Sequence, residues 1–143
     1  MKQKTLRKWL IFWSVFIGLG AYWGAAMMFI DPTGAMWSMD LLLPMLRRLP
    51  FSDFFFQDLI WSGVALLLVN GLTNTVAFVL LVKRHKYASW AAIGCAAALI
   101  VWIVAELFIF GFNPLSDIYF VFGVVQLATG ICALRTEKQI LAN

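Results

Sequence analysis

The stretch that decides the fold is residues 88–110, which read ASWAAIGCAAALIVWIVAELFIF. Within it, Glu106 is the one charged residue. A helix needs roughly 20 apolar residues to cross about 30 Å of hydrocarbon, and this run is long enough. Its apolar side chains fill successive positions, whereas a membrane-spanning strand would show alternation. The run therefore predicts a transmembrane helix.

Three further apolar runs predict membrane spans, at about residues 9–30, 57–82 and 116–134. The chain has 143 residues, of which 63% are hydrophobic and 13% are charged. Soluble domains are roughly 45–50% apolar and about 25% charged, so this composition excludes an ordinary soluble domain. We expect one transmembrane domain over residues 1–143, an all-α integral membrane four-helix up-down bundle with an interfacial segment between its first two helices.

Basic residues gather on one side of these spans. Nine of the 11 Lys and Arg residues lie before the first span, between the second and third, or after the fourth: Lys2, Lys4, Arg7, Lys8, Lys83, Arg84, Lys86, Arg135 and Lys138. The positive-inside rule then predicts that both termini are cytoplasmic. The first apolar run exceeds the 7–15 residues usual for a signal peptide, so we expect it to remain as a span. The positive charge fits contact with anionic membrane lipids and requires no nucleic acid.

The connections differ in length. Residues 83–87 and 111–114 are short links, which predict antiparallel neighbouring helices. Residues 31–56 form a long outer segment that opens with Asp31-Pro32-Thr33-Gly34, a tight-turn sequence. Its apolar pieces are too short to span and predict an interfacial helix, interrupted by Pro44 and stopped before Pro50. This segment either covers the bundle end or gates a cavity.

The start of the second span carries its own signal. Ser52 and Asp53 precede the aromatic run Phe54-Phe55-Phe56. Serine and aspartate are preferred N-cap residues, so they predict an early beginning of this helix.

Glu106 is the one acidic residue inside the apolar run of a predicted span, since Asp58 and Asp117 lie at span ends, and intramembrane acids suggest a functional site. It lies about four residues from the outer helix end, roughly 6–7 Å below the interface. Helix counting places several side chains near its depth: Tyr119, Ser62, and Tyr22 or Gly24. With Trp37 of the outer segment, Glu106, Tyr119 and Ser62 form the predicted ligand-binding or proton site. The alternative is a glutamate that ties helix ends together.

Polar and small residues also occur deeper in the spans. Asn70 and Asn74 lie four residues apart on one helix face, and Gln126 lies near mid-span. Amide hydrogen bonds between membrane helices contribute roughly 0.6–2 kcal/mol, so these residues predict polar helix contacts. A polar track leading inward from Glu106 is the alternative. Small residues serve either contacts within the bundle or a homodimer: Gly18, Gly20, Gly24, Gly123 and Gly130.

The sequence lacks the residues that several kinds of catalytic and metal-binding site require. His85 is the one histidine, and Cys95 and Cys132 are far from a CxxC spacing. No phosphate-binding loop, nucleophile elbow or HExxH pattern occurs. We therefore expect no enzyme activity, no catalytic residues, no metal and no cofactor. A third alternative is an enzyme with an outer divalent-cation site built from Asp31, Asp53, Asp58 and Glu106.

Several motifs together resemble an uncharacterised family of small four-span bacterial inner-membrane proteins. They are Asp31-Pro32-Thr33-Gly34, Pro50-Phe51-Ser52-Asp53-Phe54, Asn70-Gly71, and the set Glu106, Gly111, Pro114, Tyr119 and Gly123. The resemblance implies a multi-pass protein of the bacterial plasma (inner) membrane and no assigned activity. In similar sequences the position of Glu106 often holds Gln. Small four-helix multidrug transporters are similar in size, but their membrane glutamate lies in the first helix, which has no acid here.

The function that we expect is non-enzymatic. The protein binds a lipid or lipophilic molecule, or supports a membrane-protein partner, through an outward-facing pocket. The alternative is a homodimeric proton-coupled small-molecule transporter that uses Glu106.

Overall fold

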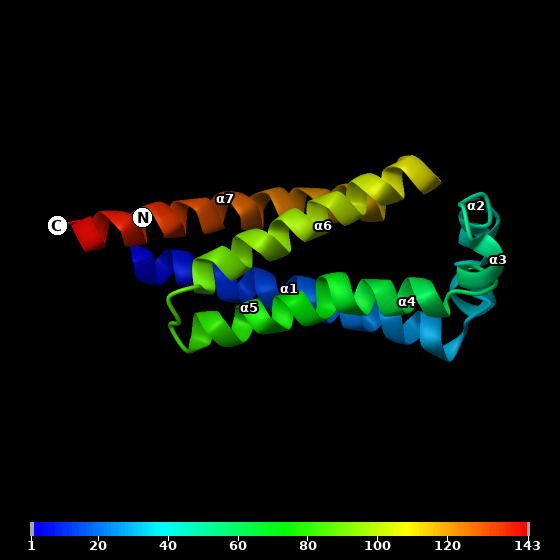
Figure 1. The fold of residues 1–143 in the computed structure, drawn as a ribbon, viewed down its shortest axis with the longest axis horizontal. Coiled ribbons are helices and arrows are strands. Elements are labelled where there is room, and N and C mark those ends of the chain that lie inside the picture. Colours follow the sequence, from blue (N-terminus) through cyan, green and yellow to red (C-terminus); the bar gives the residue numbers. More distant parts are fainter. Residues whose placement is uncertain (1, 143) are drawn as a thin grey trace.

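The computed structural model describes residues 2–142, which form helices and turns without a strand. Four long helical stretches run side by side (Figure 1). They are α1 (Gln3–Ile30), α4 (Ile60–Leu66) continued by a π-helical turn (Leu67–Leu72) into α5 (Thr73–Val82), α6 (Ala88–Phe110) and α7 (Pro114–Ala142). All four are long and apolar enough to cross a membrane. The predicted all-α four-helix fold is confirmed.

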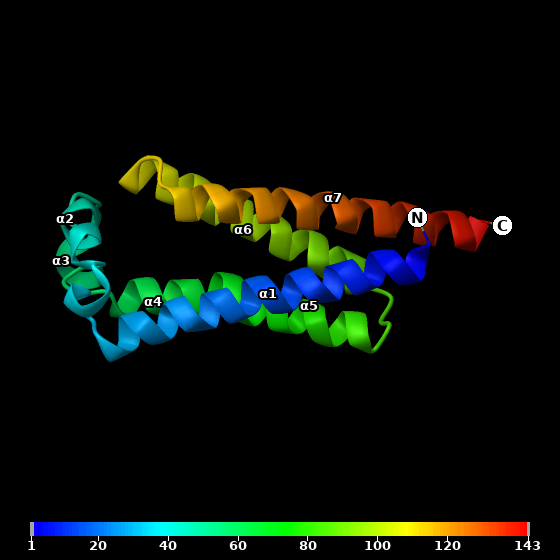
Figure 2. The same ribbon diagram turned by 180° about the vertical axis from the view of Figure 1, so that it is seen from behind.

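The four stretches form a closed bundle. Helix α1 packs against α4, α5 and α7, while α6 packs against α5 and α7. The termini lie at the same end, together with the α5–α6 loop (Figures 1 and 2). We call this the basic end, because it holds the nine Lys and Arg residues described above, and we call the other the opposite end.

Two helices extend beyond the predicted spans at the basic end. Helix α1 already begins at Gln3, and α7 continues to Ala142. The added residues include Lys, Arg, Gln and Glu, which are good helix formers, and no proline or glycine interrupts them. The helices therefore continue past the apolar runs.

The link between α6 and α7 has the residues that such a turn needs. Gly111 ends α6 with a positive φ of 75°. Pro114 occupies the first turn of α7, where its missing N–H removes no helical hydrogen bond. The Ser116 backbone N–H donates to Asn113 Oδ1 at 2.9 Å, so Asn113 caps this helix.

Three apolar clusters fill the bundle along its length. Leu10, Leu81 and Ala92 are central to the cluster at the basic end, and Ile17, Leu99 and Ile103 to the middle one. Small residues bring the helices close: an added Cβ would lie 2.8 Å from Ile93 at Gly130 and 3.0 Å from Ile100 at Gly123. Both glycines therefore serve the α6–α7 contact within one chain.

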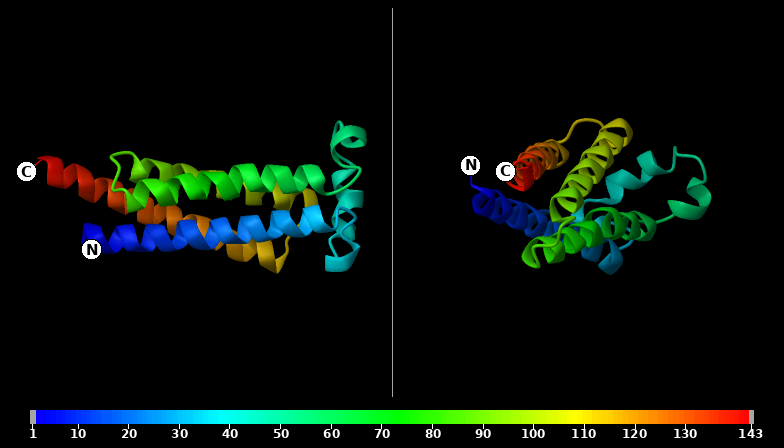
Figure 3. Two further views of the ribbon diagram at one scale, coloured as in Figure 1. Left: turned by 90° about the horizontal axis from the view of Figure 1, so that it is seen from below. Right: turned by 60° about the vertical axis from the view of Figure 1, so that its left-hand side comes forward.

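Residues 31–59 lie across the opposite end of the bundle (Figure 3, left). The predicted tight turn is present, with the Gly34 N–H donating to the Asp31 carbonyl at 3.0 Å. Two 3₁₀ turns (Ala35–Trp37 and Asp40–Leu42), α2 (Leu43–Leu46) and α3 (Ser52–Phe55) follow. Leu43 and Leu46 are buried against Leu59. The segment thus covers the bundle end.

Two local predictions for this segment are wrong. Pro44 does not interrupt a helix but lies in the first turn of α2, a position that tolerates proline. Ser52 and Asp53 do not cap the second span, because they lie inside α3, which ends at Phe56 with a non-helical φ of −125°. Helix α4 begins only at Ile60, whose N–H donates to Asp58 Oδ1 at 3.0 Å. Asp58 therefore provides the side-chain acceptor at this helix start.

Candidate functional site

Both carboxylate oxygens of Glu106 accept hydrogen bonds. The indole Nε1 of Trp102, one turn earlier on α6, donates to Oε1 at 2.6 Å. The hydroxyl of Ser116, in the first turn of α7, donates to Oε2 at 2.8 Å. Trp102 lies four residues before Glu106, so helical spacing alone would have found it. Ser116 depends on the α6–α7 turn, which no periodicity reveals.

Tyr119 packs against Gly20 of α1, where no side chain stands in its way. The two residues belong to a groove on the bundle surface, which we call the α1–α7 groove. It has a volume of about 580 Å³ and is lined by Phe16, Leu19, Gly20, Tyr22, Trp23, Ala26 and Tyr119. Its walls are apolar apart from the tyrosine hydroxyls.

The groove faces outward from the bundle. Leu19 and Trp23 on its wall are 64% and 68% exposed. The Tyr22 hydroxyl is paired with Thr75 Oγ1 at 2.7 Å. The hydroxyl of Tyr119 lies against Gly20 and makes no hydrogen bond within residues 2–142.

The predicted site residues are only partly brought together. Tyr119 and Trp102, whose indole binds Glu106, both pack against the middle apolar cluster, so Tyr119 and Glu106 lie in the same region of the bundle. Ser62 lies at the start of α4, and Trp37 ends a 3₁₀ turn at the opposite end. Neither of the latter two lines the groove or bonds to Glu106.

A second polar group lies in the bundle centre. Gln126 of α7 donates through Nε2 to Asn74 Oδ1 of α5 at 3.1 Å and to Ser14 Oγ of α1 at 3.4 Å. All three side chains are fully buried. The group therefore joins three helices at mid-bundle. Ser14 was missed by sequence reasoning, although it is the one serine in the first apolar run.

The π-helical turn lies next to this group. Three successive side chains bind the carbonyls of the turn: Thr73 Oγ1 donates to Val69 at 2.5 Å, Asn74 Nδ2 to Asn70 at 2.8 Å and Thr75 Oγ1 to Gly71 at 3.0 Å. A membrane interior offers no water to such carbonyls, so these side chains stabilise the widened turn. The buried amide of Asn70 has no partner within residues 2–142.

Four long apolar helices with large exposed hydrophobic side chains define a multi-pass helical membrane protein. Comparison of the chain with protein-family models, with curated proteins and with solved structures finds no match. Within residues 2–142, no three His, Cys, Asp or Glu side chains gather as they would around a metal ion.

Proposed function

We propose that this membrane protein binds a lipid or another lipophilic molecule in the α1–α7 groove. The observation that carries the proposal is the groove itself, with apolar walls and one tyrosine hydroxyl that makes no hydrogen bond within residues 2–142. The groove lies on helices long enough to span a bilayer, so its surroundings are acyl chains. The occupant that fits best is an acyl chain.

The chemistry of the walls supports such a ligand. Phe16, Leu19 and Trp23 offer apolar surface on which an acyl chain gains van der Waals packing, because inside a bilayer the lipid tails are already in apolar surroundings. The Tyr119 hydroxyl is a hydrogen-bond donor suited to an ester or carbonyl oxygen. An amphipathic lipid uses both features at once.

The orientation of the protein in the membrane is part of the same proposal. With its basic end on the cytoplasmic side of a bacterial inner membrane, the protein obeys the positive-inside rule. The α1–α7 groove then lies in the outer half of the bilayer, because Gly20 and Tyr119 are nearer the opposite end. The proposed site is thus reached from the outer leaflet.

The hydrogen bonds of Glu106 favour this function over proton-coupled transport. A carboxylate that carries protons during transport needs access to a substrate or to water, whereas both oxygens of Glu106 are bonded to Trp102 and Ser116. These bonds support a positioning role, in which Glu106 fixes the α6–α7 corner next to Tyr119.

The test is native mass spectrometry of protein released gently from its membrane. We expect a retained lipophile, and we expect Ala26→Phe to displace it, because the added ring fills the groove. Ala97→Phe is the matched control, since Ala97 is an exposed residue of α6 outside the groove. Tyr119→Phe should weaken retention by roughly 3- to 10-fold through the lost hydrogen bond, while Tyr87→Phe should leave it unchanged. Bare protein in every preparation would contradict the proposal.

A further inference from the structure

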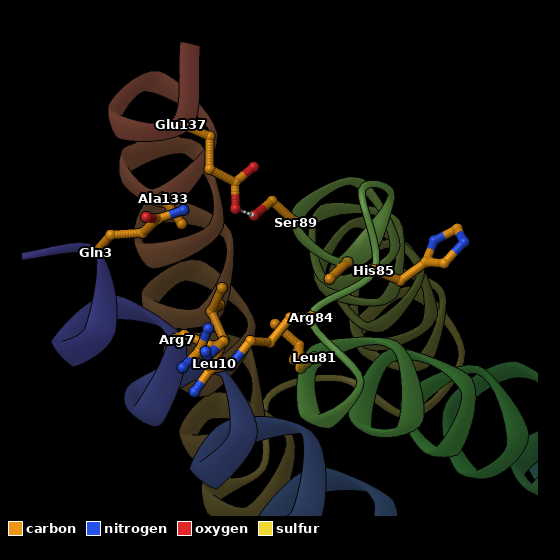
Figure 4. Close-up of a pocket in the computed structure, with 10 residues that line it drawn as sticks. Gln3, Arg7, Leu10, Leu81, Arg84, His85, Ser89, Ala133 and Glu137 are labelled. Atoms are coloured by element: carbon orange, nitrogen blue, oxygen red, sulfur yellow. Dashed lines mark hydrogen bonds between the residues drawn. The ribbon is translucent and has the colours of Figure 1, made fainter. Parts of the chain in front are cut away.

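A second cavity lies at the basic end, between α1, the α5–α6 loop and α7. It has a volume of about 60 Å³. One water molecule needs only about 10–15 Å³, so the cavity has room for a group of several atoms. Leu10 and Leu81 form its apolar floor (Figure 4). We call it the basic-end cavity.

Two guanidinium groups converge on this cavity. Arg7 of α1 and Arg84 of the α5–α6 loop both line the cavity, and their side chains extend toward one another (Figure 4). Arg84 has a positive φ of 54°, a conformation uncommon outside glycine, and the loop holds it there. Within residues 2–142, no carboxylate is bonded to either guanidinium. Two cations placed together without a counter-ion create a site for an anion.

The other polar groups of the cavity lie on a different wall. Glu137 of α7 accepts a hydrogen bond from the buried hydroxyl of Ser89 at 2.8 Å and points away from the arginines (Figure 4). The Gln3 side chain extends toward Ala133, and the His85 ring turns outward (Figure 4). Glu137 is the one acidic residue that lines the cavity, and its negative charge weakens the binding of an anion there.

We propose that the basic-end cavity binds a phosphate group through Arg7 and Arg84, as part of the headgroup of an anionic phospholipid. Guanidinium groups match phosphate oxygens with two parallel hydrogen bonds, and basic pockets between transmembrane helices hold anionic headgroups. Leu10 and Leu81 below the arginines belong to the packed core of the bundle, so the cavity takes the phosphate of the headgroup while the acyl chains stay outside the bundle. This site is independent of the α1–α7 groove, which lies toward the opposite end.

The test compares binding of short-chain phosphatidylglycerol, phosphatidylcholine with the same chains, and inorganic phosphate to the purified protein. We expect phosphatidylglycerol to bind best. Arg7→Gln and Arg84→Gln should each lower its affinity roughly tenfold. Lys8→Gln and Lys83→Gln are matched controls, because each removes the same charge from a neighbouring exposed residue outside the cavity.

Further outcomes separate the sources of the phosphate. Inorganic phosphate could bind as tightly as the lipid and lose the same affinity in the two arginine variants. That result would overturn the proposal of a lipid headgroup and identify a soluble phosphate compound as the ligand. Glu137→Gln should raise the affinity for phosphatidylglycerol, since it removes the opposing charge. An equal loss in all four Gln variants would overturn the proposal, because it would indicate diffuse attraction to the basic end. Arg84→Lys, which keeps the charge, should retain part of the affinity and separates binding from misfolding.

Discussion

At the scale of single residues, Glu106 holds the corner between α6 and α7 by accepting hydrogen bonds from Trp102 and Ser116. Glu106→Gln keeps an oxygen for the indole and an amide for the hydroxyl, so we expect it to fold and to retain ligand. Glu106→Leu loses both acceptors and should lower the free energy of unfolding by about 1–3 kcal/mol. Unfolding in detergent measures the difference.

Asp117→Asn is the control for this series, because Asp117 is an exposed acid that follows Ser116 in the first turn of α7. Asp117→Asn should change the free energy of unfolding little. If Glu106→Gln abolished a pH-dependent movement of a substrate across the membrane, the positioning role would be contradicted and the transport alternative favoured.

Gln126 of α7 hydrogen-bonds to side chains of α1 and α5 and so joins three helices. Gln126→Leu removes the bonds to Asn74 and Ser14 and leaves Asn74 Oδ1 without a donor, so we expect a loss of about 1–2 kcal/mol in unfolding free energy. Thr129→Val is the control, since the Thr129 hydroxyl bonds only within α7, to Val125 at 2.7 Å. Equal stability of the two variants would show that the buried amide contributes nothing.

Asp31 gives the first turn after α1 a dependence on pH. Its pKa is lowered below the ordinary 3.8, first by the hydrogen bond from the Thr33 hydroxyl and then by the Met36 N–H. A lowered folded pKa means that the carboxylate stabilises the turn above the ordinary value, and that this stabilisation is lost as pH falls through the folded value. The protection of the Met36 amide against hydrogen exchange, taken relative to the intrinsic rate at each pH, should therefore decrease below about pH 3.8. Asp31→Asn should show no such pH dependence of protection.

At the scale of helices, the α6–α7 contact depends on glycines that leave no room for a methyl group. Gly130→Ala places a Cβ 2.8 Å from Ile93, so we expect a destabilisation of about 1–3 kcal/mol. Gly94→Ala is the matched control, because a Cβ there has no neighbour within 4 Å and alanine favours a helix. A comparison of melting temperatures checks the pair, and a neutral Gly130→Ala would contradict the packing.

Some elements were predictable from sequence and others were not. Long apolar runs decide the helices, and Pro32 with Gly34 decides the tight turn, because both signals are local. The π-helical turn was not predicted, since Thr73, Asn74 and Thr75 look like ordinary helix residues until their carbonyl partners are known. The predicted helix start at Ser52 and Asp53 was wrong for a similar reason: the residue types suit a cap, but the path of the chain places them in α3, and α4 begins only at Ile60.

At the scale of the whole molecule, the sequence predicts how deep a residue lies in the membrane better than it predicts which residues contact one another. Helix counting placed Glu106 and Tyr119 near one level but could not tell which helix faces meet. The α1–α7 groove depends on the packing of two helices distant in sequence, and it includes Gly20 because Tyr119 of another helix covers it. Trp37 lies in the outer segment and Ser62 at the start of α4, so neither lines the groove.

The charge distribution makes a prediction about the entire chain. With nine basic residues at one end, both termini should lie on the cytoplasmic side. Reporter proteins fused at either terminus should both be active in the cytoplasm, and a cysteine at position 37 should be labelled by an impermeant reagent from outside. Opposite behaviour of the two termini would contradict an even number of spans.

The most direct test of the proposed function is to map where a lipid touches the protein in its membrane. Cells are supplied with a fatty acid that carries a photoreactive group, and crosslinked peptides are then identified. We expect crosslinks concentrated on Phe16–Ala26 and around Tyr119, and we expect Ala26→Phe to abolish them while Ala97→Phe does not. Crosslinks spread evenly over all exposed helix faces, and unchanged in Ala26→Phe, would contradict a lipid site in the α1–α7 groove.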